Sequence, residues 1–112
     1  IRNLFIMTKI YNLYMDDIMQ LGGNISLAGF KELEPAKMVV IKKITGNYAR
    51  KMQEKNKNFE SLHLNLKLIH SSKYELQAKA IVSGQSFNAE IVDFNLFFAL
   101  DKALAKILEE IS

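Results

Sequence analysis

The most regular feature of the sequence is an alternation of apolar and polar residues between positions 62 and 92. Leucine takes every second position of "LHLNLKL" (62–68), and "YELQAKAIV" (74–82) and "SFNAEIV" (86–92) continue the pattern. A period of two puts apolar side chains on one face of a strand and polar ones on the other. With "IHSSK" and "SGQ" as turns, the pattern predicts a three-stranded antiparallel meander with one solvated face.

The segment after Pro35 shows helical spacing instead. Proline suits the first turn of a helix, where its missing N–H costs nothing. One face of that helix would carry Met38, Ile41, Ile44, Tyr48 and Met52. The run "KKITGNYARKM" (42–52) allows two interpretations, a hairpin turn at Gly46-Asn47 or an uninterrupted helix. The apolar phase favours the helix, although Gly46 costs it about 1 kcal/mol relative to alanine.

Shorter signals complete the order of elements. "NISLAGF" (24–30) predicts a strand, and "NLFFALDKALAKILEEI" (95–111) predicts a final helix capped by Asp93 or Asn95. The predicted order is therefore β-α-β-β-β-α. Both helices need the apolar face of the sheet, so we expect an α+β two-layer sandwich, with two helices on one face of a mostly antiparallel four-stranded sheet.

The first 22 residues are harder to place. A helix over residues 1–21 is predicted by the spacing of Leu4, Met7, Tyr11, Tyr14, Ile18 and Leu21. "GGN" (22–24) would end this helix. The chain starts with Ile1, so the segment is interpreted as a translated upstream region, a cloning remnant or a genuine docking helix. We predict one α+β domain over residues 23–112, preceded by this extension.

Composition narrows the class of protein. The chain has 112 residues, of which 49% are hydrophobic and 24% charged, as expected for a single globular domain. Cysteine is absent, which excludes disulfides and thiolate zinc sites and fits a reducing, cytoplasmic environment. The apolar stretch at residues 3–19 carries Lys9, Asp16 and Asp17, so no membrane span is expected.

Candidate catalytic chemistry is sparse. His63 and His70 are the only histidines, and His63 falls on the solvated face of the predicted sheet. Asp93 and Asp101 are interpreted as a helix cap and a surface residue rather than a catalytic pair. We find no nucleophile elbow, P-loop or dinucleotide fingerprint. The sequence therefore predicts no enzyme, no catalytic residue, no metal, no cofactor and no small-molecule substrate.

Charge is distributed unevenly. Residues 36–58 contain seven Lys or Arg and one Glu, a local net charge of +6, whereas the whole chain carries +3. On the predicted helix Val39, Lys43, Gly46 and Arg50 fall opposite the apolar face. Such a surface is typical of phosphate binding, and a glycine allows a ligand backbone to approach closely. A solvated face without a ligand is the alternative.

A family resemblance extends from about Asn24 to Ile111. The alternating "LHLNLKLIHSSKYELQAKAIVSGQSFNAEIVDFNLFFALDKALAKILEEI", with Asp93 before a hydrophobic pair, resembles the ribosome hibernation-promoting factor and ribosome-associated inhibitor family. It is similar in particular to archaeal proteins in which a segment like "GNYARKM" precedes the meander. The resemblance implies a β-α-β-β-β-α fold in a cytoplasmic, non-enzymatic protein that binds ribosomal RNA.

Candidate RNA-binding residues follow from the basic helix and from the resemblance. The predicted set is Lys42, Lys43, Gly46, Asn47, Arg50, Lys51, Lys55 and Lys57, with Lys102 and Lys106 as weaker candidates. The expected partner is ribosomal or other structured RNA. The alternative function is a protein-interaction or self-associating module, a homodimer in its simplest form, built on a sheet edge or the apolar N-terminal segment. Phe98 is interpreted as a core-edge residue or as an anchor for a partner.

Overall fold

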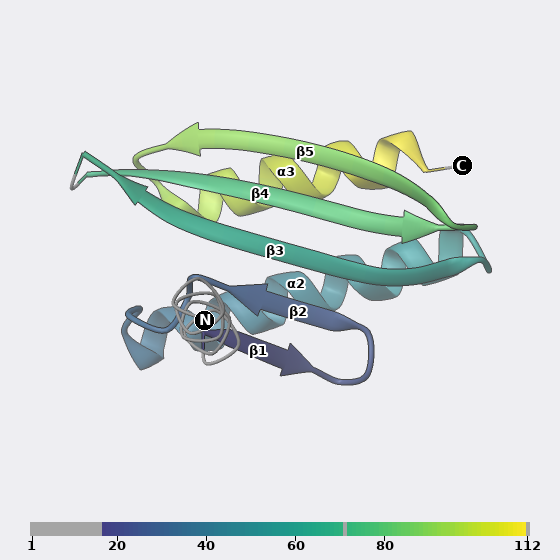
Figure 1. The fold of residues 1–112 in the computed structure, drawn as a ribbon, viewed down its shortest axis with the longest axis horizontal. Coiled ribbons are helices and arrows are strands. Elements are labelled where there is room, and N and C mark those ends of the chain that lie inside the picture. The colour runs from purple at the N-terminus through teal and green to yellow at the C-terminus, as the bar shows by residue number, and fades with distance from the viewer. Residues whose placement is uncertain (1–16, 71, 112) are drawn as a thin grey trace, which may run out of the picture.

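The computed structural model describes residues 17–70 and 72–111. In this part of the chain the elements are β1 (Ile18–Leu21), β2 (Ile25–Ala28), α2 (Pro35–Lys55), β3 (Phe59–Ile69), β4 (Lys73–Val82), β5 (Gln85–Asp93) and α3 (Leu96–Glu110). The sheet order is β1-β2-β3-β4-β5, and only β2 and β3 run parallel. Both helices lie on one side of the sheet (Figure 1). The predicted two-layer α+β class is confirmed.

The prediction of a four-stranded sheet is wrong, because β1 adds a fifth strand. Residues 18–21, expected in the last turn of a helix, pair antiparallel with β2, from Ile18 opposite Ala28 to Leu21 opposite Ile25. Gly22 allows the tight connection, since its φ of +68° is one that glycine adopts readily. Residues 1–16 of the predicted extension lie outside the described part of the chain.

The meander follows the predicted alternation. Leu62, Leu64 and Leu66 of β3 are buried, and β4 and β5 bury Leu76, Ala78, Ala80, Val82 and Ala89. Leu68 is the exception. It lies two residues before the turn that begins at His70, and 60% of its surface is exposed. Ser83 and Gly84 both have positive φ, the conformation that two-residue hairpins with right-handed twist require.

Helix α2 runs through Gly46 without interruption, so the interpretation as a hairpin turn at Gly46-Asn47 is wrong. The buried stripe of α2 consists of Met38, Ile41, Thr45, Ala49 and Met52. Its phase is helical, and packing on the sheet outweighs the propensity cost of one exposed glycine.

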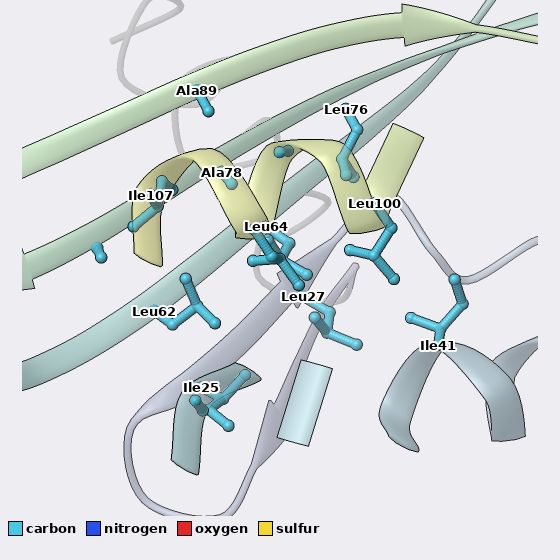
Figure 2. Packing of buried hydrophobic residues seen from close by; sticks show 14 of the residues in the cluster. Ile25, Leu27, Ile41, Leu62, Leu64, Leu76, Ala78, Ala89, Leu100 and Ile107 are labelled. Carbon is cyan, nitrogen blue, oxygen red and sulfur yellow. The ribbon is translucent and has the colours of Figure 1, made fainter. Parts of the chain in front are cut away.

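Helix α3 contributes much of the core. Leu100, Leu104 and Ile107 are completely buried. Figure 2 shows Leu100 and Ile107 near Leu62 and Leu64 of β3, with Ile41 of α2 at the edge of the same cluster. The Asn95 side chain caps the helix by accepting a hydrogen bond from the backbone N–H of Phe98 at 3.1 Å. One continuous core therefore joins both helices to the sheet.

Gly29 is the position where the chain leaves β2 for α2. Its φ is +85°, and a Cβ at this residue would lie 2.1 Å from the backbone oxygen of Leu66. No side chain fits there, so glycine is required for β2 to lie beside β3 and turn away.

Candidate nucleic-acid interface

The predicted RNA-binding residues are all exposed, and they divide into three groups. Lys43, Asn47 and Arg50 lie opposite the buried stripe of α2, and we name them the outer basic stripe. Lys42 and Gly46 lie on the flank of the helix away from α3. The third group, Lys51, Lys55 and Lys57, lies on the α3 side of the helix or in the loop that follows it.

Gly46 leaves the helix backbone uncovered beside the outer basic stripe. Within the described part of the chain, a Cβ at this position would meet no heavy atom within 4 Å, so no packing requirement there explains the glycine. What the residue provides is access, since a ligand can approach the main chain more closely here than at any position with a side chain.

Lys55 has a structural role that the sequence did not predict. Its Nζ donates hydrogen bonds to the backbone oxygens of Leu108 and Glu109 in the last turn of α3. The last carbonyls of a helix lack partners within the helix, and a cation there also complements the helix dipole. Lys55 therefore links the C-terminal ends of the two helices.

Tyr48 and Asp101 form a second link between the helices. The Tyr48 hydroxyl donates to Oδ1 of Asp101 at 2.7 Å, and Lys51 Nζ lies 5.2 Å from the centre of the Tyr48 ring. Burial, together with the hydrogen bond and the negative charge of Asp101, raises the pKa of Tyr48 to about 12. The side of α2 that faces α3 is therefore held by specific polar contacts, whereas the outer basic stripe points away from them.

Exposed aromatic residues at the start of α3 were not in the predicted site. Phe94 is 63% exposed and Phe98 is 48% exposed, so the core-edge interpretation of Phe98 is wrong; Phe97 packs at the core edge instead. Lys73 Nζ lies 5.2 Å from the centre of the Phe94 ring, and Lys102 Nζ lies 5.5 Å from that of Phe98. The sequence signal was the run "FNLFF", but helical spacing alone did not show which ring faces solvent.

The open face of the sheet carries the second cluster of polar groups. His63 lies there as predicted, with Ser26 Oγ 2.6 Å from Nδ1 and Ser61 Oγ 3.0 Å from Nε2. Burial, and the positive charge of Lys79, lower the pKa of His63. A shallow hollow of about 790 Å³ includes this residue together with Asn65 and Gln77.

The described residues form no candidate metal site. Within residues 17–70 and 72–111 no group of three or more His, Asp or Glu side chains is arranged to hold a metal ion. The same part of the chain contains no helix with the length and apolar character of a membrane span.

Comparisons with known proteins identify the fold. No protein-family model matches the chain, and no curated protein matches it. Among solved structures, a ribosomal subunit interface protein from Coxiella burnetii matches with a TM-score of 0.58 and 16% identity, over 79% of this chain and 90% of that one. The N-terminal domain of Protein Y from Thermus thermophilus matches with a TM-score of 0.58 and 17% identity, over 83% and 96% respectively.

These matches show a shared fold, and at such low identity they do not transfer residue roles. They agree with the α+β architecture expected from the resemblance noted in the sequence. The similarity to archaeal proteins receives no support from them and stays a prediction.

Proposed function

We propose that this protein is a non-enzymatic, ribosome-associated protein that binds structured RNA through the exposed face of α2. The observation that carries the proposal is the outer basic stripe on a fold shared with a ribosomal subunit interface protein and with Protein Y. The fold alone would leave the function open, and the positive charge concentrated in α2 and the loop that follows it favours an anionic partner.

The proposed contacts follow from the geometry of the helix. Lys43 and Arg50 are seven residues apart, which corresponds to about 10 Å along the helix axis at 1.5 Å per residue. Two cations at this spacing can contact separate phosphates, while Asn47 between them donates a hydrogen bond to phosphate or ribose. Gly46 lets the RNA backbone approach α2. Recognition of this kind reads shape and charge rather than sequence.

The test is co-sedimentation with ribosomes and binding to fragments of ribosomal RNA. The double variant Lys43→Glu, Arg50→Glu is expected to lose most of its affinity because phosphate contacts are replaced by repulsion. The control Lys67→Glu, Lys79→Glu makes the same change in net charge on the open face of the sheet, where both lysines are exposed, and should bind as the wild type does. Full affinity in the α2 variant, or equal loss in both variants, contradicts the proposal.

A second candidate function, self-association, is favoured by the outer edge of β5, where residues 17–70 and 72–111 place no further strand. This strand is nine residues long, ends the sheet and contains no Lys, Arg or Pro. Natural edge strands are usually protected by such residues or by being short, as β1 is with four residues. Pairing two copies of β5 antiparallel about Ala89 would place Phe87 opposite Ile91 and Asn88 opposite Glu90. That register matches apolar with apolar side chains and avoids facing carboxylates.

Cysteine cross-linking tests this register, since the chain has no cysteine of its own. Asn88→Cys combined with Glu90→Cys should give an oxidised dimer, because opposite residues in an antiparallel pair lie within disulfide range. Asn88→Cys alone has no cysteine opposite it in this register and should cross-link far less. A monomer by light scattering at high concentration, without cross-linking, would rule out the homodimer.

A further inference from the structure

Two exposed phenylalanines lie at the start of α3 and have no role in the contacts proposed for α2. Phe94 follows β5 directly, and Phe98 lies in the first turn of α3. Phe98 is on the side of α3 opposite the residues that the helix buries, which include Leu100, Ala103 and Ile107. The exposed fractions of the two phenylalanines, 63% for Phe94 and 48% for Phe98, are those of surface residues rather than of residues in an incomplete core.

The links between the helices show where these rings lie relative to α2. The Tyr48 hydroxyl donates a hydrogen bond to Asp101, and Lys55 Nζ donates one to the backbone oxygen of Leu108. The two residues of each pair are separated by 53 positions in the sequence. The helices therefore run parallel with a constant offset, which puts Phe98 level with residue 45 of α2. Packed helices have axes about 8–10 Å apart. Phe98 thus lies across one interhelical spacing from the turn of α2 that carries Lys43 and Asn47, on the outer face of the same helix layer.

The chemistry of the rings points to nucleobases. A flat aromatic face stacks on any base, and proteins that bind single-stranded nucleic acid combine such faces with cations along the backbone path. Each of these rings has an ammonium group about 5 Å away, Lys73 for Phe94 and Lys102 for Phe98. A partner protein with an apolar surface would have to remove water from both ammonium groups, whereas RNA supplies phosphates that pair with them.

We infer that the RNA bound by this protein contains unpaired nucleotides, with at least one base stacked on Phe98 or Phe94 while its flanking phosphates contact the outer basic stripe. The inference rests on the proposed function of α2 and specifies the class of RNA. A fully paired helix offers no free base face to these rings, so the site prefers a loop, a bulge or a single strand over a blunt duplex.

The experiment compares two labelled RNA probes of equal length and composition, a hairpin with an unpaired loop and a blunt duplex. Fluorescence anisotropy should show that Phe94→Ala, Phe98→Ala weakens binding of the hairpin roughly tenfold or more, with little change for the duplex. The salt dependence of hairpin binding should stay that of the wild type, since no phosphate contact is removed. Val92→Ala, an exposed apolar residue on the open face of the sheet, is the matched control and should bind both probes normally.

A loop base replaced by 2-aminopurine gives a direct readout, because its fluorescence should be quenched on binding to the wild type and not to Phe94→Ala, Phe98→Ala.

If the phenylalanine variant binds the hairpin normally while Lys43→Glu, Arg50→Glu does not, the stacking inference is wrong and the proposed function stands. A loss of ribosome binding without any loss for the hairpin would assign the rings to a protein contact and overturn the inference. If the wild type binds neither probe nor ribosomes, the proposed function fails and the inference fails with it.

Discussion

At the scale of single residues, Gly29 and Gly46 have opposite roles in one protein. Gly29 has a positive φ and lies against the backbone of β3, whereas Gly46 is helical and no atom of the described residues lies within 4 Å of where a Cβ would be. We expect Gly46→Ala to raise the free energy of unfolding by up to about 1 kcal/mol. Gly29→Ala should lower it by more than about 2 kcal/mol, through strain and the clash with Leu66. Urea denaturation of the two variants measures both effects.

Gly46→Ala also tests the reason proposed for this glycine. If RNA approaches the backbone of α2, the added methyl group should weaken RNA binding in a protein that has become more stable. A variant with both higher stability and unchanged affinity would show that access at Gly46 is not used.

Thr45 is a completely buried polar residue whose Oγ1 has no hydrogen-bond partner among residues 17–70 and 72–111. A buried hydroxyl without a partner costs free energy, so Thr45→Val, which keeps the shape, should raise the free energy of unfolding by about 1 kcal/mol. Thr45→Ser keeps the hydroxyl and removes the methyl group, and it should lower the free energy by about the same amount. Thermal and urea denaturation compare the two, and a less stable valine variant would show that the hydroxyl is satisfied in solution.

At the scale of elements, the parallel pair of helices is joined by polar links at two levels. Tyr48 to Asp101 joins the helices near their middle, and Lys55 to Leu108 and Glu109 joins them at their C-terminal ends. These links set the offset of the two helices, and this offset puts Phe98 level with residue 45 of α2.

The raised pKa of Tyr48 gives this link a pH signature. The folded protein holds the Tyr48 proton up to about pH 12, whereas the unfolded chain releases it near pH 10. The contribution of this group to stability is complete below pH 10 and is lost as the pH rises through 12. We expect Tyr48→Phe to show a shallower loss of stability between these values. Urea denaturation at a series of alkaline pH values tests it, and parallel curves for the two proteins would contradict the link.

At the scale of the whole molecule, the net positive charge is concentrated in one segment. The basic segment between residues 36 and 58 forms α2 and the loop that follows it, while the core and most of the sheet carry little net charge. If this asymmetry drives RNA binding, affinity should fall steeply with salt, and Lys43→Gln, Arg50→Gln should reduce the log–log slope by about 1.5. Titration at several salt concentrations measures the slope, and an unchanged slope would place the phosphate contacts elsewhere.

Much of the architecture could be predicted from local patterns. The leucines of β3 alternate without a break, and the apolar residues of α2 keep a helical phase through Gly46, because one face of each element must be buried. The strand β1 could not be predicted in this way. Its four residues "IMQL" satisfy a helical spacing as well as a strand spacing, and pairing with β2 decided between them.

Local patterns in the sequence specify which residues are apolar, where the elements of the meander and α2 lie, and that positive charge concentrates on α2. Contacts between distant parts of the chain set the fifth strand, the offset of the helices, the use of Lys55 as a link and the exposure of Phe98. The difference arises from the separation along the chain of the residues that interact. Periodicity reports which face of an element meets the core, whereas hydrogen bonds between strands and contacts between helices join residues far apart in the chain, and no local pattern contains them.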